Sequence, residues 1–129
     1  MSAPGTPNPK VKVTRLLKRA DFLRLSRGRR WAAPGLVLQM APSPEPVDTL
    51  RVGFTATKKL GSAVVRNRVK RRLREAARAV LPLLGTQGHD YVLVGREATA
   101  ERPFVALIED LKQALRKVHG GRPPKAEER

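Results

Sequence analysis

The residues best suited to chemistry in this sequence are cations, and they crowd into one short segment. Residues 58–74, KKLGSAVVRNRVKRRLR, contain no acidic side chain. Their cations are Lys58, Lys59, Arg66, Arg68, Lys70, Arg71, Arg72 and Arg74. Like charges at helical spacing repel one another, so a folded chain tolerates such a run when an outside polyanion neutralises it. Arginine's planar fork suits phosphate oxygens, and the segment therefore predicts phosphate binding.

An amphipathic helix over residues 63–81 would position these cations. At about 100° per residue, one narrow arc collects the apolar side chains. They are Val65, Val69, Leu73, Ala76 and Val80. Arg68 and Arg72 border this stripe, and Arg71 points away from it. Ser62 is the predicted N-cap, because a serine there can accept a hydrogen bond from a free backbone N–H of the first turn.

The whole chain, like this segment, has an excess of basic residues. It has 129 residues, 27 Lys+Arg, 11 Asp+Glu and a formal net charge of +16, which fits one domain and a polyanionic partner. The absence of cysteine excludes disulfides, thiolate zinc sites and cysteine nucleophiles. His89 and His119 are far apart in the sequence, so no protein metal site is expected. No apolar run is long enough for a membrane span.

The acidic residues give no sign of a catalytic centre. They are spread along the chain, without the close carboxylate cluster that would hold two magnesium ions for phosphodiester cleavage. Glu109 and Asp110 are neighbours on a predicted helix and so point in different directions. His89, next to Asp90, is assigned to a turn. The sequence thus predicts phosphate binding with no catalytic residue on the protein.

The rest of the chain supplies an α+β framework around the basic helix. The expected elements are a helix over 14–26 with Thr14 as N-cap, a short strand near Trp31, strands over 36–40, 50–57 and 90–95, and helices over 63–81 and 103–118. In the first helix the expected apolar stripe is Leu16, Leu17, Ala20 and Leu23. Proline-rich residues 41–48 are predicted to form a loop. We expect a single domain over 10–119, with disordered tails at 1–9 and 120–129.

Residues 51–78, RVGFTATKKLGSAVVRNRVKRRLREAAR, resemble the signature of the bacterial ribonuclease P protein component. In that family a strand ends near a Lys-Lys pair, a glycine turn follows, and the next helix carries an Arg-Asn-Arg core and further basic residues. The matching residues here are Lys58-Lys59, Gly61 and Arg66-Asn67-Arg68. The resemblance extends more weakly over residues 14–118.

The resemblance implies a protein subunit that binds a large catalytic RNA and helps it remove the 5′ leader from precursor tRNA in the cytoplasm. The hydrolytic centre and its Mg²⁺ would lie mainly on the RNA, and neither DNA nor a membrane would be a partner. The implied fold is a two-layer α/β sandwich with a four-stranded sheet and three helices (ribosomal protein S5 domain 2-like), in the order α-β-β-β-α-β-α. It would contain a left-handed crossover around the basic helix, against a strong general preference.

Two RNA-binding surfaces follow from the resemblance. The surface for the catalytic RNA would comprise Lys58, Lys59, Arg66, Asn67, Arg68, Lys70, Arg71, Arg72 and Arg74. The surface for the leader would comprise Phe22, Arg51, Thr55 and Thr57. Asn67 has an equally good structural role as a bridge to neighbouring backbone. Phe22 has an alternative place in the core, and the threonines could simply face solvent.

The chain departs from the family at the leader surface. Family members often carry aromatic side chains at positions that hold Ser26 and Gln39 here, and such side chains stack on unpaired bases. Trp31 is a substitute platform only if it does not pack against the sheet. Arg15, Arg19 or Arg51 would otherwise have to compensate.

Other functions fit parts of the same pattern. The main alternative is a general RNA-binding or ribosomal protein without a processing role, whose composition would look the same. A DNA-binding protein would use 63–81 as a recognition helix, but a strand and a glycine turn precede this helix instead of a supporting helix. A self-sufficient nuclease would need the carboxylate cluster that the sequence lacks.

Overall fold

One mixed β-sheet forms the centre of the molecule. The computed structural model describes residues 11–44 and 48–120, and its five-stranded sheet has the order β1-β4-β5-β3-β2. The strands are β1 (Lys12–Arg15), β2 (Arg29–Ala32), β3 (Leu36–Pro42), β4 (Thr49–Thr55) and β5 (His89–Gly95). The helices are α1 (Arg19–Ser26), α2 (Ala63–Leu84) and α3 (Phe104–His119), with 3-10 turns η1 (Lys58–Leu60) and η2 (Glu97–Ala100).

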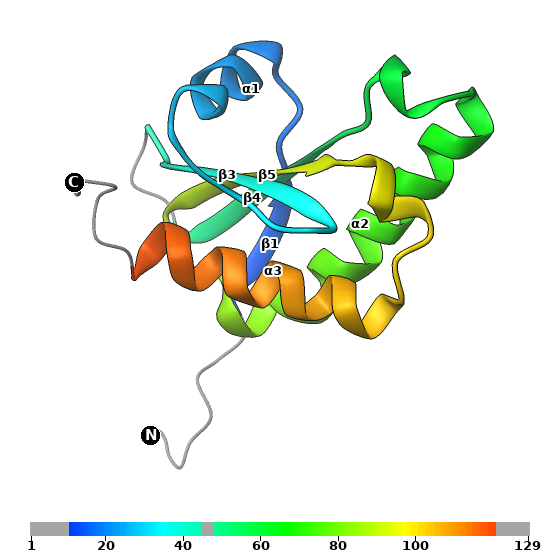
Figure 1. Cartoon of the computed structure of the whole chain (residues 1–129). Coiled ribbons are helices and arrows are strands. Elements are labelled where there is room, and N and C mark those ends of the chain that lie inside the picture. Colours follow the sequence, from blue (N-terminus) through cyan, green and yellow to red (C-terminus); the bar gives the residue numbers. More distant parts are fainter. Residues whose placement is uncertain (1–10, 45–47, 121–129) are drawn as a thin grey trace, which may run out of the picture.

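The helices lie on both faces of this sheet. α2 and α3 cover one face, while α1 lies across the other, over β3 and β5 (Figure 1). Alternation along the strands explains the division. Leu38 and Tyr91 belong to the large core beneath α2 and α3, whereas Val92 packs under α1 with Leu16 and Leu25. The sheet therefore has a thick helical layer on one side and a single short helix on the other, here called the α1 face.

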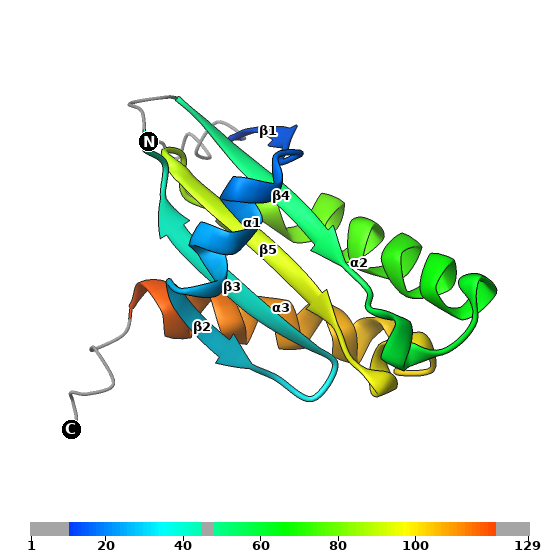
Figure 2. The same cartoon turned by 90° about the horizontal axis from the view of Figure 1, so that it is seen from above.

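The crossover around the basic helix is left-handed. β4 and β5 are parallel neighbours, joined through α2. Seen from the α1 side, β5 lies to the right of β4 along the strand direction and α2 passes behind the sheet (Figure 2). A right-handed connection would place the helix in front. This handedness, which only the family resemblance had suggested, sets α2 against the sheet beside β1, β4 and β5.

The sheet has five strands, not the predicted four, and the element order is β-α-β-β-β-α-β-α. The additional strand, β1, occupies the start of the predicted 14–26 helix, and Thr14 is a strand residue whose Oγ1 donates to the Leu50 carbonyl at 3.4 Å. β1 is a four-residue edge strand with only β4 beside it. Such a strand has too few residues to show alternation against the stronger leucine pattern that follows.

The predicted apolar stripe of the first helix is also wrong. Leu17 is 76% exposed and Leu23 is 50% exposed, whereas Leu25 is fully buried and Phe22 packs beside it. α1 has only eight residues, and it begins after Leu16, whose burial belongs to the chain leaving β1. The helix turns a different face to the sheet because its true start is five residues later than predicted.

The other elements match the sequence closely. α2 keeps the predicted buried stripe and continues through Pro82 to Leu84. α3 begins at Phe104, with Pro103 as its N-cap, and the short strand at Trp31 is present. β3 extends to Pro42, two residues into the predicted loop. Residues 45–47 of that loop and the tails at 1–9 and 121–129 lie outside the described residues, and Gly120 is the C-cap of α3.

Candidate nucleic-acid interface

A glycine turn and a serine cap set the start of the basic helix. Gly61 has φ = 131°, a backbone conformation that favours glycine. The Ser62 side chain then accepts a hydrogen bond from the Val65 N–H at 3.3 Å, as predicted for the N-cap. η1 comes directly before this turn, so Lys58 and Lys59 are held next to the first turn of α2.

The nine predicted residues for the catalytic RNA lie together on η1 and α2, and this set is called the α2 surface below. Lys58, Lys59, Asn67 and Arg71 are exposed. Within the described residues only Arg68 of this set comes within ion-pair distance of a carboxylate, at 4.0 Å from Glu101. The α2 surface is therefore a concentration of positive charge with almost no internal neutralisation.

Two of its arginines also fasten α2 to the rest of the fold. Arg68 donates from Nε to the Ala100 carbonyl at 2.9 Å, and Arg72 donates from Nη2 to the Arg102 carbonyl. Arg102 in turn pairs with the buried Asp110 of α3, with 2.5 Å between Nε and Oδ2. Both arginines border the apolar stripe, so their side chains reach the backbone of residues 100–102, which packs against α2. Arg71 and Arg74 make no such bond within the described residues.

The α1 face contains the predicted leader residues. The Phe22 side chain is half-buried and lies against Gly53, where a Cβ atom would come within 2.5 Å of its ring. Thr55 is half-buried. It lies on the same face, because it pairs with Val94 of β5, which packs against the cluster under α1. Thr57 is exposed, just beyond the end of β4. Phe22 thus has a packing role and a partly exposed ring.

Arg51 is held by an ionic network instead of facing solvent alone. Its Nε and Nη2 atoms lie 2.9 Å and 2.6 Å from the two carboxylate oxygens of Asp90, which is fully buried. Arg24 of α1 pairs with the same carboxylate and with Asp21 at 3.1 Å. The network ties α1 to β4 and β5, and it neutralises a carboxylate that would be costly to bury unpaired.

Trp31, Gln39 and Ser26, the positions considered for stacking on leader bases, lie in different parts of the fold. Trp31 packs into the core on the α3 side, with Lys117 Nζ at 5.2 Å from its ring centre, so it lies on the opposite face of the sheet from Phe22. Gln39 lies on the α1 face, paired with Val92. Ser26 ends α1 and donates to the Leu23 carbonyl at 2.6 Å. Phe22 is the only aromatic side chain of the described residues on the α1 face.

Sequence reasoning missed a cluster at the other end of the sheet. His89 and His119, thirty positions apart, bring their ring centres to 5.0 Å, and Tyr91 Oη lies 2.5 Å from His119 Nε2. Burial, chiefly, raises the pKa of Tyr91. Burial, followed by the charges of His89 and Arg29, lowers the pKa of His119. The alternation of His89 and Tyr91 was a usable signal, but nothing in the sequence placed the end of α3 beside them.

Metal-ligand groups do not gather on the described part of the chain. No three His, Cys, Asp or Glu side chains lie close enough there to hold a metal ion. In the same part of the chain, the two histidines that do meet have no carboxylate close enough to complete a metal site with them. Nor is any helix within residues 11–44 and 48–120 sufficiently long and apolar to cross a membrane.

Comparison with known proteins gives a consistent result. The family model described as Ribonuclease P matches residues 11–119. The ribonuclease P protein component of Paramagnetospirillum magneticum is 53% identical over 112 residues, which cover 84% of each chain. That of Gluconacetobacter diazotrophicus is 55% identical, with 82% of this chain and 91% of the relative covered.

Solved structures agree with the sequence comparison. The RNase P protein from Thermotoga maritima matches with a TM-score of 0.69 and 28% identity, and covers 82% of this chain and 98% of that one. The Staphylococcus aureus RNase P protein matches with a TM-score of 0.67 and 29% identity, covering 83% and 98%.

Proposed function

Because the chain belongs to the bacterial ribonuclease P protein family, and so is the protein subunit of ribonuclease P in tRNA processing, we propose that its α2 surface binds the catalytic RNA of that enzyme. The observation that carries the proposal is the charge of this surface, which has one distant carboxylate partner within the described residues. An RNA backbone supplies the missing negative charge, and its binding releases counterions. Family membership also decides against a ribosomal or general RNA-binding role.

We further propose that the α1 face takes the 5′ leader of precursor tRNA. Phe22 offers a partly exposed ring for stacking on an unpaired base, and Thr55 and Thr57 offer hydroxyl groups for phosphates or sugars. Arg51 is committed to Asp90. Its part is to hold α1, and therefore Phe22, in position above β4. A single aromatic platform predicts a modest contribution of leader stacking, about 1–3 kcal/mol.

Ribonuclease P hydrolyses a phosphodiester bond, and either its RNA or its protein subunit could carry the catalytic centre. We propose that the catalytic centre lies on the RNA and that RNA groups hold most of its Mg²⁺. The described residues of this chain contain no group of three ligands that fits a magnesium ion. Magnesium would supply charge neutralisation and an activated water when bound to the RNA. The chain contributes affinity and orientation, and we propose that it does so in the cytoplasm, where its RNA partners are made.

The salt dependence of binding tests the role of the α2 surface. Arg71→Ala removes a charge that has no partner within the described residues. The logarithmic salt slope for binding of the catalytic RNA should fall in magnitude by about 0.7–0.9 if one phosphate contact is lost. Lys112→Ala, on α3, removes the same charge elsewhere and should leave the slope unchanged. Equal slopes for wild type and Arg71→Ala would show that this side chain does not contact phosphate.

A further inference from the structure

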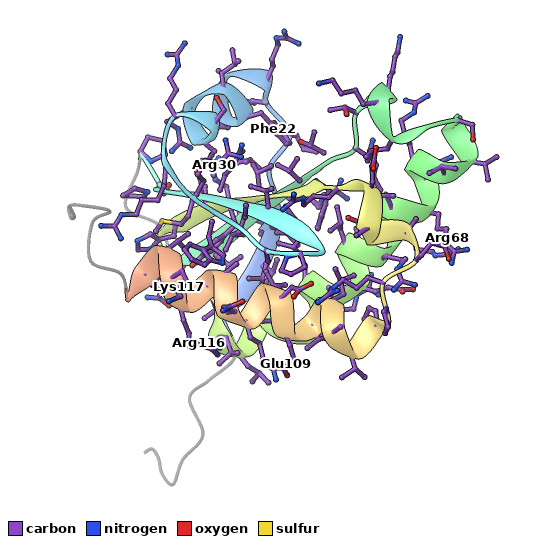
Figure 3. The ribbon with its side chains drawn as sticks, viewed as in Figure 1. Phe22, Arg30, Arg68, Glu109, Arg116 and Lys117 are labelled. Carbon is purple, nitrogen blue, oxygen red and sulfur yellow. The ribbon has the colours of Figure 1, made fainter. Side chains whose placement is uncertain are left out.

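A pocket lies at the end of the molecule far from the start of α2. Its volume is about 390 Å³, within the range of small-molecule sites. The lining includes Arg29, Met40, Pro42, His89, Val118 and His119. The last turns of α3, where Arg116 and Lys117 are labelled, are at this end, and Arg68 of α2 is at the other (Figure 3). The proposed binding surfaces for the catalytic RNA and the leader use none of these residues.

A hydrogen-bond chain runs from Thr86 through Tyr91 to one imidazole of this pocket. The Thr86 N–H donates to Tyr91 Oη at 3.0 Å, so the hydroxyl is an acceptor on that side. Tyr91 is fully buried, and its hydroxyl oxygen lies 2.5 Å from His119 Nε2. When the hydroxyl donates to this nitrogen, neutral His119 carries its ring proton on Nδ1. Within the described residues no hydrogen bond involves that Nδ1 atom, so its N–H is then a donor for a ligand.

The other walls combine apolar surface, a second ring and a cation. Met40, Pro42 and Val118 supply apolar contact, and His89 stands at 78° to the His119 ring. Arg29 donates from Nη1 to the Val118 carbonyl at 2.7 Å, which fixes its guanidinium at the end of α3. Flat apolar surface, imidazole faces and directed donors suit a heteroaromatic base better than a bare anion.

The segments that line the pocket carry basic side chains and no acidic ones. The segments that form it, residues 28–42, 86–89 and 111–120, contain no Asp or Glu. Arg116 and Lys117 are exposed in the same turn of α3 as His119. The nearest carboxylate in the sequence, Asp90, is buried and paired with two arginines. A nucleotide with its phosphate toward these cations would be complementary in charge, and its base would lie flat against an imidazole, which the carboxylates of an acidic peptide cannot do.

We propose that this pocket binds an unpaired RNA nucleotide, with the base against His89 and His119 and the flanking phosphates at Arg29, Arg116 and Lys117. The choice of RNA as partner rests on the proposed function, but the site is separate from the α2 surface and the α1 face. An RNA contact at this end of the molecule, in addition to the α2 surface at the other end, would fix the orientation of the subunit on its RNA. One charged helix cannot do this alone.

The test uses the fact that the full chain has only two histidines, both in this pocket. The imidazole resonances of the intact protein are followed by NMR during titration with a short, unstructured oligouridylate. Both rings should shift and saturate together. His89→Ala should weaken this binding about tenfold, a typical loss for one stacking contact. Arg116→Gln with Lys117→Gln should weaken it also, while the matched change Lys112→Gln on the same helix should not.

Separate arms distinguish the ligand classes and the two proposals. Inorganic phosphate that shifts both imidazoles as strongly as the oligouridylate would overturn the nucleotide site in favour of an anion site, and an equal response to blunt duplex RNA would overturn the requirement for an unpaired base. Absence of any imidazole shift would also overturn the proposal. Arg71→Ala should leave the imidazole titration unchanged, so a failure of the α2 surface would appear only in the salt slope for the catalytic RNA.

Discussion

At the scale of single residues, the arginines of α2 have two roles that composition does not separate. Arg68 donates to the carbonyl of Ala100, the last residue of η2, and Arg72 donates to that of Arg102, whereas Arg71 and Arg74 make no such bond within the described residues. The helical spacing predicted which arginines border the apolar stripe. It did not reveal that residues 100–102 would lie within their reach, because that depends on how η2 packs against α2.

This division predicts different effects on stability. Arg72→Ala should lower the free energy of unfolding by about 1–3 kcal/mol, since it removes a charge-assisted hydrogen bond to the Arg102 carbonyl. Arg71→Ala should change it by less than about 0.5 kcal/mol, as is usual for an exposed side chain. Urea denaturation measures both. A similar loss in the two variants would mean that Arg72 does not anchor the helix.

Asp90 is the residue on which the arginine network of the α1 face depends. Asp90→Asn keeps the size of the side chain but leaves Arg24 and Arg51 without their shared carboxylate. Breaking a buried ion pair typically costs about 3–5 kcal/mol, and we expect a loss of that order in the free energy of unfolding. The exposed Glu97→Gln serves as the control in the same denaturation experiment. Unchanged stability of Asp90→Asn would contradict the role assigned to the network.

His119 predicts a pH dependence of stability. Burial, then the charges of His89 and Arg29, lowers its pKa in the folded protein below the ordinary value of 6.5. As the pH falls below 6.5, the unfolded chain gains a proton that the folded one resists, so the free energy of unfolding decreases, by at most about 1.4 kcal/mol per pH unit for one proton. The loss stops below the folded-state pKa.

The matched variant for this effect is His119→Gln, whose amide oxygen can accept from Tyr91 without titrating. Denaturation midpoints above and below pH 6.5 should differ less in this variant than in the wild type. An identical pH dependence in the two proteins would remove His119 as its source.

At the scale of elements, long periodic segments were predictable and short edge segments were not. The pattern of α2 specified its stripe and its cap, because 22 residues repeat the signal many times. β1 has four residues, and its pairing with β4 comes from tertiary contacts that a local pattern cannot contain. The same error moved the start of α1 and exchanged Leu23 for Phe22 and Leu25 on its inner face.

α1 therefore turns Phe22 toward the sheet, against Gly53 of β4, whereas its neighbour Leu23 points to solvent. Phe22→Ala should weaken binding of precursor tRNA to the holoenzyme more than binding of mature tRNA, by about tenfold for one lost stacking contact. Leu23→Ala, at an exposed position of the same helix, should weaken neither. Equal losses for the two tRNAs in Phe22→Ala would place Phe22 in the core alone.

At the scale of the whole molecule, the net charge is +16, and most lysines and arginines within residues 11–44 and 48–120 form no ion pair with a carboxylate. Composition predicted a polyanionic partner, the acid-free segment 58–74 predicted where phosphate would bind, and the family resemblance predicted which RNA it would be. The pocket at the far end was not predictable, because the sequence distance between His89 and His119 concealed their contact. We propose that the subunit positions RNA and leaves the chemistry to its RNA partner.

Reconstituted cleavage of precursor tRNA is the most direct test of that account. The purified chain, the catalytic RNA and the two together are each incubated with precursor tRNA at low Mg²⁺, and removal of the 5′ leader is measured. We predict cleavage when both are present and none with the chain alone, and a loss of stimulation when Arg71 and Arg74 are both replaced by alanine. Cleavage by the chain without RNA, or full stimulation by the doubly substituted chain, would contradict the account.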